Sequence, residues 1–220
     1  MLAIELVSDT IPPVHTSDSI QKVMERMQEF RIRHLPIVNE EQFLGLISDS
    51  DLVEETDYQV PIGSLALSLV NPYVLEDQHI YDVIRLFYEQ QLTIVPVLDS
   101  KKNYMGLIAI NTLVEYFAKL TSVSDPGGII VLEIGDKNNS LAHMAQIVES
   151  DNAQILSSYV RTFPDSTRIE ITLKVNKVDI SAIVATFMRY EYEVKATFNH
   201  SDNNDNSKDR YDSLMNYLNL

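Results

Sequence analysis

The sequence predicts an α+β protein in which two tandem copies of one small unit are followed by a third unit of a different kind. The first observation is an internal repeat with a period of about 60 residues: residues 32–39 resemble residues 92–99, and residues 45–47 resemble residues 106–108. The second is a cluster of Ser, Pro and Gly at residues 121–128, which is typical of a linker. Beyond this linker the order of β-rich and helical patterns changes.

The first copy is expected over residues 1–60. Asp18 and Ser19 carry short oxygen side chains that can accept from the free N–H groups of a first helical turn, so a helix is expected to begin there. The apolar residues of this helix recur at helical spacing: Ile20, Val23, Met24 and Met27. The elements expected next are a strand ending near Val38, a polar turn at 39–42, a returning strand at 43–47, and a helix from Ser50 or Asp51.

The second copy is expected over residues 61–122 and repeats the same order. Its elements are a helix at 79–90, strands at 93–98 and 104–109, and a helix at 111–120.

The third unit is expected over residues 127–200, with the order βαββαβ. Its elements are strands at 129–134, 155–163, 168–175 and 192–198, and helices at 140–150 and from Asp179. The strand at 168–175 alternates between apolar and polar residues, which predicts one buried and one solvated face. Residues 201–220 form a polar tail with an expected short helix on Tyr211, Leu214, Met215 and Leu218.

The charge excludes several classes of partner. The chain has 220 residues, with 17 Lys and Arg against 32 Asp and Glu, and a formal charge of -15. Such a surface repels nucleic acid and anionic lipid, whose binding depends on Lys and Arg. The absence of cysteine excludes disulfides and thiol chemistry. The start of the chain lacks the features of a signal peptide, and no apolar run approaches the roughly 20 residues of a membrane span, so we expect a cytoplasmic protein.

The two copies resemble the CBS domain, and the tandem pair resembles a Bateman module. The residues that carry this resemblance are 33–38 and 45–52 in the first copy, and 94–97 and 106–108 in the second. The third unit resembles an ACT domain in its element order and in residues 136–142, which stand where that family has its Asp-Arg-Pro-Gly loop. The whole arrangement is similar to the bacterial acetoin-utilisation regulatory protein family.

The CBS resemblance implies a site for an adenine nucleotide between the two copies. The family's ribose-binding pattern is complete in the first copy, where Gly45, Leu46, Ile47 and Ser48 are followed by Asp51. A carboxylate can accept from both ribose hydroxyls, and Ser48 can donate to a phosphate. The resemblance places Arg33 and His34 at the phosphates. It places three residues of the second copy near the adenine: Leu67, Leu92 and Thr93.

Two departures from the family patterns restrict the expected sites. Ala109 and Thr112 stand in the second copy where Ser48 and Asp51 stand in the first, so we expect one competent nucleotide site and one degenerate site. In the ACT-like loop, the expected ligand residues are Asp136, Asn138 and Asn139, with the two Asn replacing the family's Pro and Gly.

Simpler roles remain open for the same residues. Asp51 can act only as a helix cap, and Arg31, Arg33 and His34 can form a solvated strand edge. The acidic residues around Asp49 are those expected at a helix start. The histidines have no metal-ligand spacing, and no catalytic motif is present, so we expect neither a metal nor an enzyme.

These observations predict a non-enzymatic regulatory protein that binds an adenine nucleotide, such as AMP, ADP, ATP or S-adenosylmethionine, without a further cofactor. A homodimer is implied by the family, and a regulated enzyme is an expected partner. Two alternatives remain: a dimerising interaction module with vestigial sites, and an amino-acid sensor that acts through the ACT-like unit.

Overall fold

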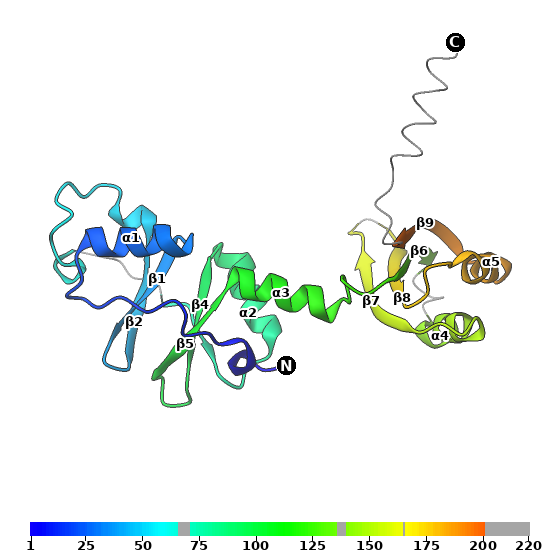
Figure 1. Cartoon of the computed structure of the whole chain (residues 1–220), viewed down its shortest axis with the longest axis horizontal. Coiled ribbons are helices and arrows are strands. Elements are labelled where there is room, and N and C mark those ends of the chain that lie inside the picture. Colours follow the sequence, from blue (N-terminus) through cyan, green and yellow to red (C-terminus); the bar gives the residue numbers. More distant parts are fainter. Residues whose placement is uncertain (66–70, 136–139, 165, 201–220) are drawn as a thin grey trace, which may run out of the picture. The chain divides into compact units, whose positions relative to one another are not determined.

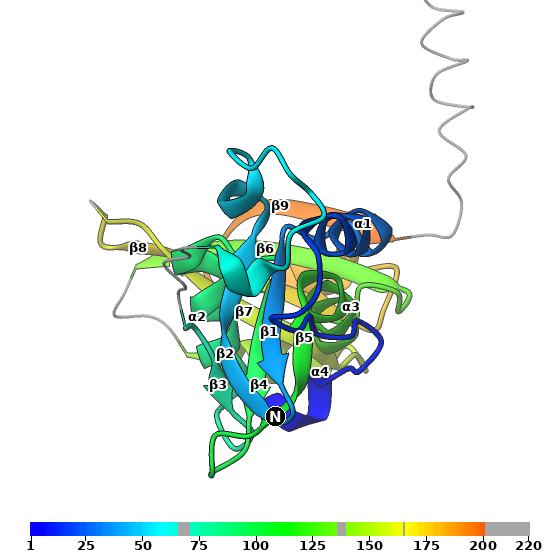
Figure 2. The same ribbon diagram turned by 90° about the vertical axis from the view of Figure 1, so that its left-hand side faces the viewer.

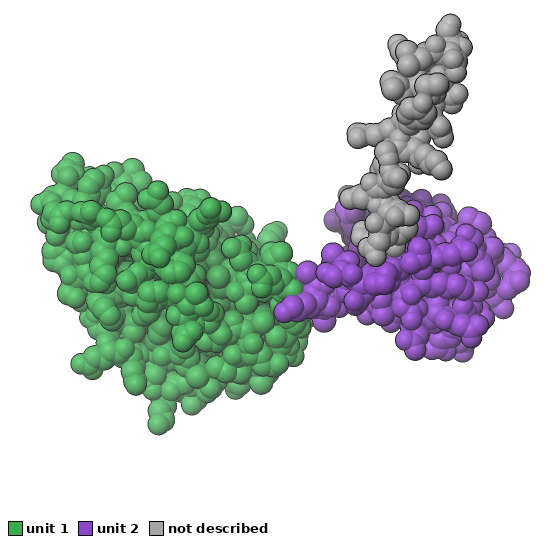
Figure 3. Space-filling model, in the orientation of Figure 1, with its two compact units in different colours: residues 1–116 green, residues 117–220 purple. Residues whose placement is uncertain are grey.

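The structure is a computed structural model that describes residues 1–65, 71–135, 140–164 and 166–200. The chain divides into two compact units, Met1–Tyr116 and Phe117–Leu220 (Figure 3). Each unit has its own apolar core. Within the described residues, no helix is both long and apolar enough to cross a membrane. The tail after residue 200, with its expected helix, lies outside the described residues.

The first copy begins as the sequence predicts. Its elements are α1 (Ile20–Phe30), β1 (His34–Asn39) and β2 (Gln42–Ser48), followed by the short 3-10 turn η2 (Asp49–Leu52). Ser19 caps α1, since its side chain accepts from the Lys22 N–H at 3.3 Å. Most of the predicted apolar stripe of α1 is buried, but Met24 is 43% exposed. The stripe of α1 is therefore narrower than its sequence suggests.

The second helix predicted for the first copy is wrong. From Asp49 the chain makes only the four-residue turn η2, in which Leu52 is buried. The residues that follow, Val53-Glu54-Glu55-Thr56-Asp57, offer no apolar side chain that is buried three or four positions after Leu52. A helix that lacks an apolar face to pack gains little from tertiary contacts, and short helices depend on those contacts.

The second copy has a full helix at the equivalent place. Its elements are β3 (Val74–Leu75), α2 (Ile80–Gln90), β4 (Ile94–Leu98), β5 (Tyr104–Ala109) and α3 (Ile110–Leu120). Leu113 is buried in α3, and Tyr116 packs against the core of the same unit. The hairpins β1–β2 and β4–β5 each carry a glycine at positive φ, Gly45 or Gly106, where the pairing register shifts. These shared bulges confirm the duplication at the level of backbone geometry.

The short segment that leads into each copy is hydrogen-bonded to the other copy. The N-terminal turn η1 (Ala3–Leu6) precedes the first copy, yet the N–H of Ala3 donates to Gln78 O at 2.9 Å, and Met1 O accepts from Ile80 N–H. The turn η3 (Ile62–Ser64) precedes the second copy, yet the N–H of Ile62 donates to Asp18 O at 2.9 Å. The N-terminus accordingly lies beside the second copy in Figures 1 and 2. Neither copy is complete without the other.

The second unit is a four-stranded antiparallel sheet with two helices. Its elements are β6 (Gly127–Gly135), α4 (Leu141–Ser150), β7 (Ile155–Thr162), β8 (Arg168–Val175), α5 (Ser181–Arg189) and β9 (Glu193–His200). The strand order is β7-β8-β6-β9, and the element order is βαββαβ as predicted. Both helices pack on one face of the sheet (Figure 1), and the apolar residues of β8 point into this core: Ile169, Ile171, Leu173 and Val175.

The other face of β8 is less solvated than the alternation predicts. Thr172 is 7% exposed and Lys174 is 6% exposed, and the Lys174 Nζ donates to Gly127 O. The chain just before β6 covers part of this face, since the Ser157 hydroxyl donates to Thr121 O at 3.0 Å. Residues from Phe117 onward therefore belong to the compact second unit, although the Ser, Pro and Gly cluster that suggested a linker begins only at 121.

Gly106→Ala is expected to weaken the packing of the N-terminal segment on β5. A Cβ at this residue would lie 2.6 Å from the Val7 Cγ1, and its φ of +143° is one that side chains rarely allow. The variant should lose about 1–3 kcal/mol of stability. Hydrogen exchange of the β5 amides should become faster.

Gly135→Ala is the control, because a Cβ there meets nothing within 4 Å. Equal exchange rates of β5 in Gly106→Ala and in the wild type would contradict this account of the packing.

Candidate functional site

The residues predicted for the nucleotide site meet at one end of the two hairpins of the first unit. His34 begins β1 and lies opposite Ser48, the last residue of β2. Thr93 immediately precedes β4, and β1 and β4 are in contact (Figures 1 and 2). The Arg33 N–H donates to the Thr93 Oγ1 at 3.0 Å. The structure therefore brings the residues of both copies together here.

His34 is joined to Thr93 by two further contacts. The His34 Nδ1 accepts from the Thr93 N–H at 3.3 Å and lies 3.0 Å from the Thr93 Oγ1. An Nδ1 that accepts from an N–H carries no proton, so the Thr93 hydroxyl is the donor to it. Burial lowers the pKa of His34 below 6.5, although Asp49 opposes this effect. Burial therefore favours the uncharged form of His34, which bridges the two copies through Thr93.

Arg33 forms an ion pair that its sequence pattern did not indicate. The Arg33 Nε lies 2.9 Å from the Asp49 Oδ2, and Nη2 lies 3.4 Å from Oδ1. The Asp49 N–H also donates to Arg33 O at 3.0 Å. The Arg33 guanidinium holds the pKa of the Asp49 carboxyl below its ordinary value. The register of β1 and β2 explains the pair: His34 lies opposite Ser48, and each partner is one residue beyond that pair.

Asp51 has the capping role that the sequence left open. Its Oδ2 accepts from the Ser48 N–H and from the Ser48 Oγ, both at 2.7 Å. Ser48 is the cap residue of η2, so the two residues form a reciprocal capping pair. Among the described residues no hydrogen bond to the Asp51 Oδ1 is found, and Asp51 is exposed. Capping therefore leaves one carboxylate oxygen for a ligand. Because η2 has only four residues, no α-helix begins at Ser48.

The three apolar residues predicted for the nucleotide site do not present side chains to a ligand among the described residues. The Ile47 side chain is fully buried, so this residue can offer a ligand only its backbone. Leu92 is 7% exposed and lies in the core beside the site residue Thr93. Leu67 lies outside the described residues.

At the equivalent place, the second copy repeats one backbone hydrogen bond of the first copy but has different side chains. The Ile110 N–H donates to Thr93 O at 3.1 Å, as the Asp49 N–H does to Arg33 O. Ala109 ends β5, and Thr112 lies in the first turn of α3. Neither side chain carries a charge, which fits the predicted degenerate site.

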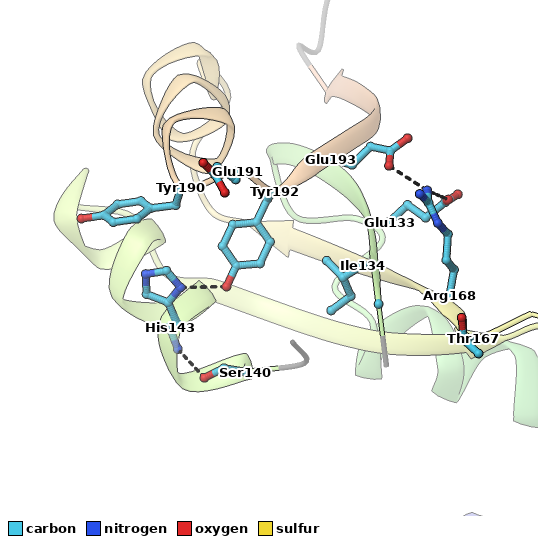
Figure 4. Close-up of a pocket in the computed structure, with 11 residues that line it drawn as sticks. Glu133, Ile134, Ser140, His143, Thr167, Arg168, Tyr190, Glu191, Tyr192 and Glu193 are labelled. Carbon is cyan, nitrogen blue, oxygen red and sulfur yellow. Dashed lines mark hydrogen bonds and ion pairs between the residues drawn. The ribbon is translucent and has the colours of Figure 1, made fainter. Parts of the chain in front are cut away.

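A separate pocket of about 790 Å³ lies in the second unit (Figure 4). The predicted loop residues Asp136, Asn138 and Asn139 lie outside the described residues, but Gly135 and Ser140 on either side line this pocket. The other lining residues are Glu133, Ile134, His143, Thr167, Arg168, Tyr190, Glu191, Tyr192 and Glu193. Sequence reasoning missed most of these residues, because they come from four segments that are separated in the chain.

The pocket has an aromatic side and a charged side, as Figure 4 shows. On the aromatic side, the His143 Nδ1 lies 2.7 Å from the Tyr192 hydroxyl, and the His143 ring packs edge-on against Tyr190. Burial raises the pKa of Tyr192. On the charged side, Arg168 pairs with Glu133 and Glu193. Within the described part of the chain, no group of three His, Asp or Glu residues is arranged to hold a metal ion.

The sequence matches the CBS domain family in two segments, residues 3–57 and 68–119. One similar solved structure is a CBS domain pair/ACT domain protein from Thermotoga maritima, with 22% identity, a TM-score of 0.48, and coverage of 53% of this chain and 96% of that one. A second is CBSX2 in complex with AMP, with 20% identity, a TM-score of 0.44 and coverage of 53% and 95%. A third is the cytosolic domain of the Mg²⁺ channel MgtE in complex with ATP, with 20% identity, a TM-score of 0.42 and coverage of 52% and 48%.

The His34 bridge is expected to make stability depend on pH. The folded pKa of His34 lies below the unfolded value of 6.5. The unfolded chain therefore binds the proton more readily than the folded protein does. The contribution of uncharged His34 to the free energy of unfolding is complete above pH 6.5 and is lost as the pH falls from 6.5 toward the folded pKa. Urea unfolding measured on both sides of this value should show a decrease in the free energy of unfolding at the lower pH.

His34→Gln is the comparison variant, because it removes the titrating group at a similar side-chain length. The decrease at low pH should be smaller in this variant. An unchanged pH dependence would show that His34 is not its source.

Proposed function

Because residues 3–57 and 68–119 form a tandem pair of CBS domains, we propose that the chain is a non-enzymatic regulatory protein that binds an adenine nucleotide where the two copies meet. The observation that carries this proposal is the position of Asp51. Its side chain is exposed in η2, directly after β2, and keeps one carboxylate oxygen outside the capping pair with Ser48. The contacts of Arg33 and His34 with Thr93 belong to the same end of the hairpins.

The proposed binding mode assigns one role to each side of the site. The Asp51 Oδ1 accepts from the ribose hydroxyls, and such charge-assisted hydrogen bonds are stronger than neutral ones. Arg33 faces the group attached to the ribose. Thr93 and Leu92 of the second copy lie toward the base, where Thr93 and the backbone near Leu92 can offer polar contacts.

Regulation follows from the contacts that join the copies. The Arg33 N–H and the His34 ring both bind Thr93 across the junction. A ligand that contacts β2 on one side and Thr93 on the other has different affinities for different packings of the copies. This difference is the free energy available for shifting the protein between conformations.

The wider proposal is a cytoplasmic homodimer that acts on a regulated enzyme. Large apolar side chains are exposed on the helices α1, α2 and α3, including Met24, Tyr88 and Val114. Such side chains supply contact area for a second copy. The similarity to the acetoin-utilisation regulators and the ACT-like nature of the second unit remain predictions.

The pocket of the second unit supports a second candidate function, the binding of an amino acid. The ion pairs of Arg168 with Glu133 and Glu193 provide charges of both signs, which suit a zwitterion, and the aromatic side suits an apolar side chain. Both sets of residues line a single pocket of about 790 Å³.

Asp51→Ala is expected to weaken nucleotide binding by about 10- to 150-fold. This corresponds to about 1.5–3 kcal/mol for the loss of a charge-assisted hydrogen bond. Titration calorimetry with AMP, ADP, ATP and S-adenosylmethionine on the wild type and the variant would measure the change. Circular dichroism would show whether the loss of the capping contact to Ser48 has altered the fold.

Thr112→Ala is the matched control, because Thr112 occupies the equivalent position in the second copy. It should bind the ligand as tightly as the wild type does. The absence of heat with all four ligands would refute the proposed function, whereas unchanged binding by Asp51→Ala would refute only the assignment of the site.

The second candidate predicts that at least one amino acid raises the melting temperature of the second unit, because a ligand that binds only the folded state stabilises it. Tyr190→Ala should remove this shift, since the Tyr190 ring borders the pocket. Tyr159→Ala on β7 is the control, because Tyr159 is exposed to a similar extent and does not line the pocket. A screen of the twenty amino acids without any shift would exclude the candidate.

A further inference from the structure

The cation of the proposed nucleotide site is already paired within the protein. Asp49 contacts the Arg33 guanidinium through both carboxylate oxygens, at 2.9 and 3.4 Å. The two side chains are 69% and 46% exposed, so a ligand can reach both of them. Asp49 immediately follows Ser48 at the end of β2, and its N–H is held by Arg33 O at 3.0 Å. The backbone therefore keeps the carboxylate beside Arg33 when the side-chain pair opens.

The formal charge of the proposed site is negative. Arg33 carries its positive charge, and Asp49 and Asp51 carry negative charges. His34 is neutral at pH 7, because burial lowers its pKa and its Nδ1 accepts from Thr93. Thr93 brings no charge from the second copy. Arg31, two residues before Arg33, is exposed at the C-terminal cap of α1 and takes no part in the contacts that join the site.

A polyphosphate is a poor ligand for such a site. A terminal phosphate carries a charge of about -1.5 to -2 at pH 7, and each additional phosphate adds to it. To reach Arg33, a triphosphate must displace Asp49 and then remain beside the displaced carboxylate. Like charges at close distance oppose binding, and this repulsion increases with the charge of the ligand.

We propose that Asp49 acts as a specificity-determining residue that restricts the site to adenosyl ligands with at most one phosphate, or with a cationic group in its place. This inference rests on the proposed nucleotide-binding function and identifies its ligand class. AMP can share Arg33 with Asp49 through a single phosphate. S-adenosylmethionine brings a sulfonium and an ammonium group that Asp49 attracts. ATP meets the repulsion of Asp49 along its whole phosphate chain.

The test is titration calorimetry of AMP, S-adenosylmethionine and ATP, with a chelator present so that no Mg²⁺ neutralises the phosphates. The wild type should bind ATP at least about 10-fold more weakly than AMP. Asp49→Asn keeps an oxygen that accepts from Arg33 but removes the charge. It should reduce the preference for AMP over ATP by about 5-fold or more, and it should weaken the binding of S-adenosylmethionine.

Three further variants complete the design. Asp49→Glu keeps the charge and should preserve the preference of the wild type, while Asp49→Ser is a second neutral variant. Asp82→Asn on α2 is the matched control, because it also removes the charge of an Asp that is paired with an Arg, here Arg85, and changes the net charge by the same amount. Asp82 lies in the first turn of α2, an 11-residue helix about 16 Å long, and Thr93 follows the other end of this helix. Asp82→Asn should leave the preference for AMP over ATP unchanged.

The outcomes separate this inference from the proposed function. Binding of ATP as tight as that of AMP in the wild type would overturn the role of Asp49 while leaving nucleotide binding intact. An equal effect of Asp82→Asn and Asp49→Asn would overturn it as well, because it would assign the preference to net charge. The absence of binding by all three ligands to the wild type and to both neutral variants would overturn the proposed function itself.

Discussion

The first unit depends on the exchange of leading segments between its two copies. The turn η1 is bound to the start of α2, and the turn η3 is bound to the start of α1, through backbone hydrogen bonds of the same kind. This exchange requires the hairpins of the two copies to lie together, and Thr93 then satisfies both the Arg33 N–H and the His34 ring. These hydrogen bonds link the two copies directly, so the junction contributes to their packing and is also the proposed place for a ligand. A change in the packing of the copies must therefore disturb these contacts first.

The junction is symmetric in backbone and asymmetric in chemistry. The bond from the Asp49 N–H to Arg33 O is repeated by the bond from the Ile110 N–H to Thr93 O, so both copies present the same frame. Only the first copy has charged side chains at these positions, Arg33 and Asp49. An acidic protein with a single, already paired arginine at this place has little capacity for highly charged anions. The net charge of -15 and the local pairing of Arg33 thus act in the same direction.

The failures of the sequence-based predictions have local causes. The helix expected from Ser50 ended at Leu52, because no buried apolar position follows it within a helical turn. Met24 lies on an apolar stripe but is exposed, and Lys174 lies on a polar face but is buried. In both cases the outcome depends on which neighbouring segment covers the position, which hydrophobic periodicity does not encode. From the sequence, Asp49 is one more acidic residue of an expected helix start, and only the register of β1 and β2 brings it to Arg33.

The sequence by itself determined the duplication, the βαββαβ order of the second unit, the cap of α1 and the set of residues around Ser48, Asp51, Arg33 and His34. These features are encoded locally, in periodicity, turn residues and short motifs. The tertiary structure decided that His34 bridges the two copies, that Arg33 is paired with Asp49, and that Asp51 uses one oxygen as a cap. It also brought four separated segments together around the pocket of Figure 4. Charge state and hydrogen-bond partners depend on burial and on groups distant in the chain, and these are established only when strands pair and the two copies pack together.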